Sequence, residues 1–320
     1  MEEKAKAPLP KSSRIAIFSM CSIGVASIVF SILSSINFAK SSPKAGLSNW
    51  MANCDDNVKL SSLSIPGSHD SGAKHSLADV AGICQDLSIK EQLEGGARFL
   101  DIRLKNYKGN LVVYHGEVNQ DLSFDNVLDS VYSFLSSHPS ETILLSVKEE
   151  SKASGSSESF DSLMKKKKEK TPKYWTNDSS LGLLGDHRGG IILLSRYSGS
   201  SFGVNLYNGW EDMDSGEKEN TFDIGTTHIQ DFYKVSDIVD KKNEITSAFS
   251  FSSANESSLT LNFLSGYMTN GFPPSYSVSV ASTIIPWAKE TFSSYSSLGI
   301  TITDFFSSEI GSLIVQRNAL

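Results

Sequence analysis

Seven ionisable side chains follow or end short apolar segments that have the composition of buried strands. They are His69, Arg103, His115, Lys148, Arg196, Asp231 and Asp304. Taken singly, a histidine is more often a structural side chain than a catalyst, and a strand-end Arg or Lys is usually solvated. Because the carboxyl ends of the strands in a barrel meet on one face, seven such groups in equivalent positions predict a common site.

The residue types in this set fit the cleavage of a phosphodiester. Imidazoles titrate near neutral pH, so one of His69 and His115 can accept a proton while the other donates one. Arg103 offers a planar guanidinium that matches a phosphate and stabilises the charge developing on it. Such a trio cleaves a phosphodiester that has a neighbouring hydroxyl. Hydrogen bonds to a polyhydroxylated head group are expected from three strand-end residues: Lys148, Arg196 and Asp231.

The segments that would position these groups are short, β-branched and almost continuously apolar, which is typical of strands buried on both faces. Eight are predicted, at residues 60–65, 98–103, 111–115, 142–148, 191–196, 225–231, 259–264 and 300–304. Apolar residues at helical spacing predict helices at residues 124–138, 277–292 and 305–316. The pattern predicts an α/β fold, an irregular TIM-type (β/α)8 barrel. We expect the irregularity at residues 104–110, a connection too short for a helical crossover.

The net charge of the chain indicates which classes of ligand it would bind. The chain has 320 residues and a net charge of −7, which argues against nucleic acid as a ligand. The lysine run at residues 165–168 follows apolar residues at helical spacing, so we interpret it as the solvated face of a helix. Contact with anionic lipid is the lesser alternative for this run.

The first 46 residues differ in composition from the rest. Residues 1–14 are polar and basic, and an uncharged run at residues 15–38 is long enough to cross a bilayer as a helix. We predict a cytoplasmic tail, a transmembrane signal anchor, a linker at residues 39–46 and one catalytic domain at residues 47–320. Basic residues before the run place that domain on the lumenal or extracellular side. Cleavage of the run as a signal sequence, giving a secreted protein, is the alternative.

Two further features bear on the compartment. Asn177 and Asn255 begin N-x-S sequons, which agree with a lumenal domain that is a glycoprotein. Cys21 lies in the apolar run, whereas Cys54 and Cys84 belong to the predicted domain. These two either pair in an oxidising compartment or remain buried thiols, and their spacing matches no metal-ligand motif.

Seven sequence blocks surround the strand-end residues in order along the chain. They are SIPGSHDSG at residues 64–72, GARFLDIR at 96–103, YHG at 114–116, PSETILLSVK at 139–148, GDHRGGIILLSRYSG at 185–199, IQDFYKVS at 229–236 and TD at 303–304. From residue 60 to the C-terminus the sequence thereby resembles the bacterial-type, metal-independent phosphatidylinositol-specific phospholipases C of the X-domain family. The resemblance does not cover the first 45 residues.

The resemblance implies acid–base roles for four residues. His69, oriented by Asp304, would take the proton of the inositol 2-hydroxyl. His115, supported by Asp70, would protonate the diacylglycerol oxygen. The implied products are diacylglycerol and inositol 1,2-cyclic phosphate, which is slowly opened to inositol 1-phosphate. The implied partners are phosphatidylinositol or glycosylphosphatidylinositol lipids at a membrane surface.

The resemblance also implies how the substrate is bound. Arg103, placed by Asp101, would contact the phosphate. Four residues would contact the inositol ring: Lys148, Arg196, Asp231 and Tyr233. Calcium-dependent relatives have a carboxylate where Arg103 stands and an Asn where Asp70 stands, so no metal and no cofactor are expected here.

Two other functions remain to be weighed. The first is a membrane-anchored protein that binds inositol lipids without turnover, which loss of either histidine would have favoured. The second is a metal-dependent glycerophosphodiesterase on a similar barrel, which would need a Glu/Asp cluster beside the first histidine. The loop at residues 266–276, with Tyr267, Met268 and Phe272, either enters a membrane interface or packs on the barrel rim.

Overall fold

The computed structural model describes residues 46–75, 82–176, 179–210, 221–269 and 277–318. The predicted tail, the predicted anchor at residues 15–38, the linker up to residue 45 and the Asn177 sequon lie outside these residues. Among the described residues, no helix combines the length and the apolar character needed to cross a membrane. The described residues belong to one compact unit, Lys40–Leu320.

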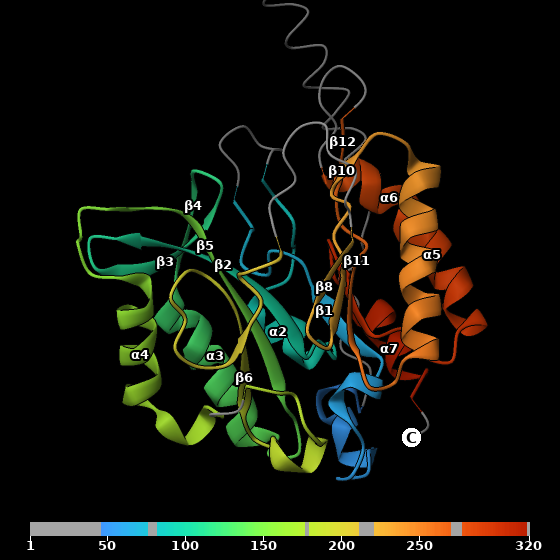
Figure 1. The fold of residues 1–320 in the computed structure, drawn as a ribbon, viewed down its shortest axis with the longest axis horizontal. Helices are drawn as coiled ribbons and strands as arrows, with labels where there is room; N and C mark the ends of the chain where they lie inside the picture. The colour runs from blue at the N-terminus through green and yellow to red at the C-terminus, as the bar shows by residue number, and fades with distance from the viewer. Residues whose placement is uncertain (1–45, 76–81, 177–178, 211–220, 270–276, 319–320) are drawn as a thin grey trace, which may run out of the picture. The chain divides into compact units, whose positions relative to one another are not determined.

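A curled sheet of parallel strands forms the centre of this unit (Figure 1). In spatial order its parallel strands are β7 (Val204–Asn205), β6 (Ile191–Arg196), β5 (Ile143–Ser154), β2 (Phe99–Tyr107), β1 (Ile65–Ser68), β13 (Ile300–Thr303), β11 (Leu259–Phe263) and β9 (Thr227–Gln230). At one edge, β8 (Thr221–Ile224) pairs with β9 in antiparallel orientation. Within the described ranges no ladder joins β7 to β8. The α/β fold is therefore confirmed, and the predicted barrel is an open, curled sheet.

The first predicted strand starts too early in the sequence. Leu60–Ser62 forms a 3-10 helix, η2, and the strand begins only at Ile65. Serine hydroxyls compete for backbone groups in this stretch: Ser62 Oγ donates to the Lys59 carbonyl at 2.8 Å, and Ser61 Oγ donates to Glu256 O at 2.7 Å. The local bond of Ser62 favours a turn over a ladder, and the long-range bond of Ser61 ties this turn to the segment after α5.

The third predicted strand exists, but it is not a parallel strand of the barrel. It forms β3 (Asn110–His115), which pairs with β2 in antiparallel orientation, while β4 (Val118–Ser123) pairs with β3 in turn. Lys108 and Gly109 join β2 to β3 with φ of 51° and 79°. Two positive φ values in a two-residue connection make a hairpin turn that matches the twist of its strands. The irregularity expected at residues 104–110 is this hairpin.

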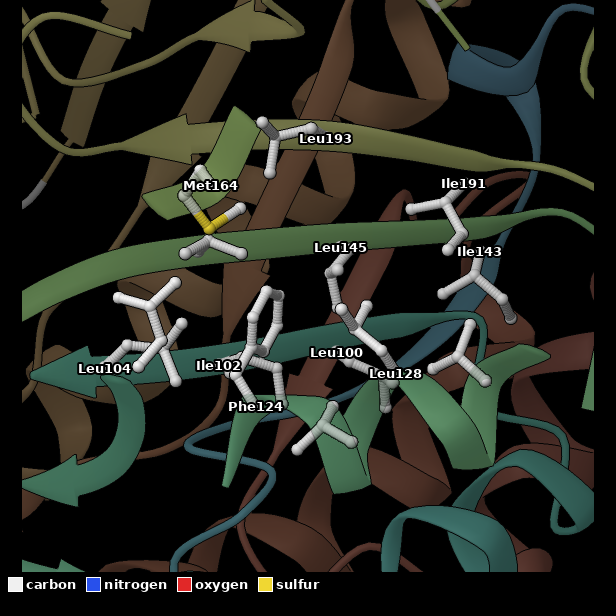
Figure 2. Close-up of a cluster of buried hydrophobic side chains, with 14 of the residues drawn as sticks. Leu100, Ile102, Leu104, Phe124, Leu128, Ile143, Leu145, Met164, Ile191 and Leu193 are labelled. Atoms are coloured by element: carbon white, nitrogen blue, oxygen red, sulfur yellow. The ribbon is translucent and has the colours of Figure 1, made fainter. Parts of the chain in front are cut away.

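Alternating side chains divide the strands between two apolar cores. Figure 2 shows the outer core, in which Leu100, Ile102 and Leu104 of β2 lie beside Phe124 and Leu128 of α3. The inner core takes the alternate positions of the strands. Its members include Ile65, Phe99, Leu144, Ile192, Leu261 and Ile300. Because the apolar inner residues occupy the amino ends of the strands, polar side chains are left to the carboxyl ends.

The helices flank the sheet in Figure 1. They are α2 (Ile89–Glu94), α3 (Phe124–Ser137), α4 (Phe160–Lys170), α5 (Ile238–Ala254), α6 (Ser277–Thr291) and α7 (Ser308–Val315). The three predicted helices correspond to α3, α6 and α7. The last begins later than expected because the Ser307 hydroxyl caps it by accepting from Ile310 N–H. The lysine run lies on α4, where Lys165 and Lys166 are exposed and pair with Asp161 and Glu158.

Two short parallel strands form a second, separate sheet. In β10 (Lys234–Val235) and β12 (Tyr267–Met268), Lys234 pairs with Tyr267. The start of the predicted membrane-interface loop is thus a short strand, and Phe272 lies outside the described residues.

A buried ion pair joins the amino-terminal segment to the sheet. Arg98 and Glu141 are both 0% exposed, with Nη2 and Oε2 2.7 Å apart. The Arg98 guanidinium also lies 4.6 Å from the centroid of the Phe134 ring. Its remaining N–H groups donate to the carbonyl oxygens of Leu47, Ser48, Leu93 and Ala97. Every N–H donor of Arg98 is therefore satisfied. Because the pair is buried, removal of the cation would leave Glu141 without its charge partner.

We predict that Arg98→Met lowers the free energy of unfolding by about 3–5 kcal/mol, because breaking a buried pair leaves an uncompensated charge. Urea denaturation of the purified chain would measure this. Lys105→Met is the control, since Lys105 pairs with the exposed Glu117 at 2.9 Å and exposed pairs contribute less than about 1 kcal/mol. Equal losses in the two variants would contradict the structural role of Arg98.

Candidate active site

The strand register places three basic side chains in one row across the sheet. Arg103 on β2 pairs with Lys148 on β5, which pairs with Arg196 on β6. Two residues earlier on the same strands, Asp101 pairs with Ser146. Residues two apart on a strand point to the same face, so Asp101 and Arg103 face the same side of the sheet. The row lies at the carboxyl ends of the strands, where barrel enzymes build their sites.

His69 follows β1 directly and bonds through both ring nitrogens. Nδ1 lies 2.7 Å from Asp304 Oδ1, and Nε2 lies 2.8 Å from Arg103 Nη2. A guanidinium has no acceptor, so His69 Nε2 must accept this bond. The ring is therefore neutral, with its proton on Nδ1 and donated to Asp304. Its basic lone pair is at Nε2, beside the cation.

The pKa of His69 reflects the same contacts. Burial lowers this pKa, but the charge of the Asp304 carboxylate and its hydrogen bond outweigh burial. Arg103 opposes protonation, and the net pKa is raised above the ordinary imidazole value of 6.5. Asp304 therefore makes His69 a stronger base than a solvated histidine.

Three carboxylates converge on the Arg103 guanidinium. Arg103 Nε lies 3.3 Å from Asp101 Oδ2 and 3.6 Å from Asp70 Oδ2. Arg103 Nη1 lies 3.8 Å from Oε1 of Glu150, whose other oxygen lies 3.5 Å from Lys148 Nζ. These contacts hold the guanidinium in place next to His69.

The charges of this cluster stabilise one another. Burial raises the pKa of Asp101, but Arg103 and Arg196 outweigh it and hold this pKa well below its usual range. Burial lowers the pKa of Arg103, but Asp101 and Asp70 raise it well above its ordinary value. At neutral pH, Arg103 is thus a permanent cation and Asp101 a permanent anion.

Asp70 and His115 form the second half of the site. Asp70 has φ of 40°, an uncommon conformation for a residue other than glycine, and its N–H donates to Asp101 Oδ2 at 3.2 Å. Its Oδ2 lies 3.6 Å from His115 Nε2. His115 Nδ1 is 2.9 Å from the Gly82 carbonyl, which can only accept. Nδ1 therefore carries a proton, and Nε2 is the nitrogen that faces Asp70.

The head-group side of the site is built around Trp210. The Arg196 guanidinium lies 3.4 Å from the centroid of the Trp210 ring, a cation–π contact. Trp210 Nε1 donates to Asp231 Oδ2 at 3.0 Å, and Arg196 Nη1 donates to Asp101 Oδ1 at 3.3 Å. A cleft of about 560 Å³ opens here, lined by Lys148, Glu149, Arg196, Tyr207, Asn208, Gly209 and Trp210.

Tyr233 stands two residues beyond Asp231. Its N–H donates to the Asp231 carbonyl at 3.0 Å, and its ring centroid lies 6.1 Å from that of Tyr267. The structure thus groups the other predicted site residues through direct contacts or strand register, and it places Tyr233 beside β12.

Two residues of the site, and one thiol beside it, were not predicted from the sequence. Glu150 had a signal, because it follows Lys148 by two positions and β5 continues past the expected end. Trp210 lies after β7, outside any periodic segment. Cys84 is buried, with its sulfur near both histidines. Cys84 and Cys54 are free thiols, so the two do not pair.

Comparison with known proteins places this fold and site in a class. Residues 59–196 match the family described as "Phosphatidylinositol-specific phospholipase C, X domain". The chain is 30% identical over 235 residues to a 1-phosphatidylinositol phosphodiesterase of Staphylococcus aureus, covering 68% of this chain and 74% of that protein. It is 29% identical over 282 residues to the enzyme of the same name from Listeria monocytogenes, covering 84% of each.

A solved structure is similar over nearly its whole length. The phosphatidylinositol-specific phospholipase C of Listeria monocytogenes superposes with a TM-score of 0.71 at 26% identity, covering 86% of this chain and 99% of that one. The chain therefore belongs to the family of bacterial phosphatidylinositol-specific phospholipases C, and the resemblance stated from its motifs is confirmed.

We predict that Asp304→Asn lowers the pKa of His69, because the variant removes the charge that favours the imidazolium. NMR titration of labelled histidine in the purified chain would show the parent His69 titrating above 6.5 and the variant titrating at lower pH. Asp223→Asn is the control, since Asp223 contacts only the distant His228 among the described histidines. An unchanged His69 titration in Asp304→Asn would contradict the assignment.

Proposed function

We propose that this chain cleaves the phosphodiester of phosphatidylinositol, using the inositol 2-hydroxyl as the nucleophile. The observation that carries the proposal is the neutral His69 ring, whose Nε2 lies 2.8 Å from Arg103 Nη2. A general base is thereby held next to a permanent cation, which is the pairing that attack on a phosphate requires. The activity named for the Staphylococcus and Listeria relatives supports the same substrate.

The first half of the reaction belongs to His69. The substrate hydroxyl takes the place of Arg103 at Nε2, and the ring accepts its proton as the oxygen attacks phosphorus. The imidazolium formed is stabilised by Asp304, 2.7 Å from Nδ1. Arg103 is then available to the non-bridging phosphate oxygens, where negative charge gathers.

The second half belongs to His115. The bond between phosphorus and the glyceride oxygen breaks, and Nε2 of His115 delivers a proton to that oxygen. Asp70 Oδ2 lies 3.6 Å from the ring nitrogen that performs this transfer. His69 has gained one proton and His115 has lost one. The products are diacylglycerol and inositol 1,2-cyclic phosphate, which water opens slowly by the reverse assignment of roles.

The cleft beside Trp210 accommodates the inositol ring in this proposal. Lys148 and Arg196 line it as hydrogen-bond donors, and Asp231 is the nearby acceptor. These groups are held by Glu150, Asp101 and the indole rather than by solvent, so they are ordered before the substrate arrives. Tyr233 would present its ring to one face of the sugar.

We also propose that the reaction needs no metal. The oxygens of Asp70, Asp101 and Glu150 are the kind of ligand that calcium prefers. All three face the Arg103 guanidinium, at 3.6, 3.3 and 3.8 Å. A permanent cation at this point supplies the charge that calcium would contribute and repels a second cation.

The proposal extends to the lipid substrate and to the compartment in which the domain acts. Either free phosphatidylinositol or a glycosylphosphatidylinositol anchor offers the required inositol 2-hydroxyl. The uncharged run at residues 15–38 would anchor the domain to a membrane on its non-cytoplasmic side, close to such lipids.

We predict that His69→Ala and His115→Ala each lower turnover of phosphatidylinositol by roughly 10²- to 10⁴-fold, since each removes one proton transfer. In an inositol phosphate ester of nitrophenol, the nitrophenolate leaves without needing a proton. This ester should restore activity to His115→Ala but not to His69→Ala. Phosphate-product analysis by NMR would measure turnover and identify the cyclic phosphate.

The control variant His228→Ala, at a histidine that stacks on Phe251 of α5, should retain parent activity in this assay. Equal responses of the two histidine variants to the nitrophenyl ester would reverse or remove the base and acid assignments. Tight lipid binding by the parent without product would favour the alternative of a lipid-binding protein.

We predict that EDTA does not lower the activity and that added calcium does not raise it at constant ionic strength. Arg103→Ala should be severely impaired, because no other cation stands next to His69 Nε2 in the described site. Lys165→Ala is the control at an exposed cation of α4, where Lys165 pairs with Asp161. Loss of activity in EDTA that calcium restores would overturn the metal-independent mechanism.

We predict an uncleaved anchor with the domain on the non-cytoplasmic side. The mature N-terminus would be identified by mass spectrometry, and glycans would be mapped at Asn177 and at Asn255, which is exposed at the end of α5. A mature protein that begins near residue 40 would show a secreted enzyme instead.

A further inference from the structure

Cys84 is fixed between two strand ends of the active site. Its N–H donates to the Ala73 carbonyl at 2.9 Å, and its carbonyl accepts from Phe305 N–H at 2.7 Å. The side chain is buried. Its sulfur belongs to two groups of potential metal ligands, in each of which the ligand atoms lie within 4.8 Å of one another. One group adds His69 and Asp304, and the other adds Asp70 and His115.

The group of Asp70, Cys84 and His115 is the better metal site. Asp70 Oδ2 and His115 Nε2 are 3.6 Å apart, close to the separation of about 3.5 Å between neighbouring ligands of a tetrahedral zinc ion. Asp70 is 0% exposed, and neither of its carboxylate oxygens accepts a hydrogen bond from any described residue. A buried carboxylate in this state has coordination capacity to offer.

His115 has the orientation of a metal ligand. Its Nδ1 donates to the Gly82 carbonyl at 2.9 Å, which leaves Nε2 to coordinate. Metal-binding histidines almost always donate their other ring N–H in this manner. The His115 side chain is 29% exposed, so an ion and its remaining water ligand can reach Nε2 from solvent.

The alternative group is less suited. Asp304 and His69 Nδ1 already share a hydrogen bond of 2.7 Å, and Asp304 is fully buried. An ion there would have to break that bond and displace its proton. Coordination by Asp70 and His115 leaves that bond in place and opens a contact of 3.6 Å. The Cys84 thiol would give up its hydrogen bond to Asp304 in either group.

We propose that Asp70, Cys84 and His115 form a binding site for Zn²⁺ that inhibits the enzyme. A thiolate, an imidazole and a carboxylate are a donor set that zinc binds, with water at the fourth position. Zinc at His115 Nε2 removes the proton that the leaving oxygen requires. Calcium prefers oxygen ligands and would not use the thiolate. The binding site stands on the geometry alone, whereas the inhibition rests on the proposed function.

The neighbouring charges permit this site. Arg103 lies 3.6 Å from Asp70 Oδ2 and opposes a second cation. Asp101, Glu150 and Asp304 surround the same region as anions. Together with Asp70, these carboxylates face three cations, Arg103, Lys148 and Arg196. Loss of the thiol proton adds a further negative charge, so the anions outnumber the cations around the bound ion.

Binding is tested with the full chain, freed of metal by chelation and titrated with Zn²⁺ against a chromophoric zinc chelator. We expect one equivalent to bind at this site. Cys84→Ala should weaken binding by more than about tenfold, since even loss of an outer-shell partner costs roughly 10- to 100-fold. Cys54→Ala, the other described thiol, should bind as the parent does. Co²⁺ should give a thiolate charge-transfer band in the parent and none in Cys84→Ala.

The ligand set is tested by two further variants in the same titration. Asp70→Asn should weaken zinc binding, and Asp304→Asn should not. The reverse order would overturn the assignment of ligands. Equal zinc affinity of Cys84→Ala and the parent would overturn the site itself.

Inhibition is measured separately, on phosphatidylinositol turnover. Zinc should inhibit the parent reversibly, with recovery in EDTA. Cys84→Ala should keep the basal activity and lose sensitivity to zinc over the same range. Zinc that binds through Cys84 without inhibiting would overturn the inhibitory role. Failure of the proposed enzymatic function would appear instead as no turnover in any variant, with zinc binding unchanged.

Discussion

The site depends on one buried guanidinium, that of Arg103. It donates to His69 Nε2 at 2.8 Å and thereby fixes the tautomer of the ring. It also gathers Asp70, Asp101 and Glu150 around itself. Without this cation, three buried carboxylates would repel one another at short range, and burial would drive them towards the protonated form. The charge that is proposed to meet the substrate phosphate is therefore also the charge that holds the carboxylates of the site together.

The sheet supplies this arrangement through its register. Alternate positions of β2 and β5 face the inner core, beginning with Phe99 and Leu144, which pair with each other. Four residues further along, the same faces present Arg103 and Lys148, which also pair. The inner core and the site are thus successive layers of one face. A shift of the register by one residue would exchange both layers for the outer core at once.

Much of this was predictable from the sequence because the strands are nearly continuous apolar runs. Each of three such runs ends at a basic side chain, so Arg103, Lys148 and Arg196 could be assigned to one end of the sheet. The roles came from the motifs around His69 and His115. Those motifs also predicted the family, which the comparisons confirm.

Other parts of the structure could not be predicted from the sequence. Residues 60–62 have the composition of a strand, but their conformation depends on hydrogen bonds from serine hydroxyls to backbone carbonyls. One of these carbonyls belongs to Glu256, almost 200 residues away in the sequence. Trp210 in the site and Cys84 beside it come from segments without periodicity, so only tertiary structure reveals their positions. The direction of β3 was missed because an apolar run does not state whether its partner is parallel or antiparallel.

The hairpin that carries His115 has a consequence for how this scaffold can diversify. His69 emerges from β1, which is laddered to β13 on one side and β2 on the other. His115 sits on β3, an arm joined to the rest through β2 and β4. In the proposed reaction, Lys148 and Arg196 would face the sugar and belong to the main sheet, whereas His115 would face the departing alcohol and belongs to the arm. Changes in the length and turn of the arm can thus alter which leaving alcohol is accepted, without changing the residues that are proposed to bind the sugar.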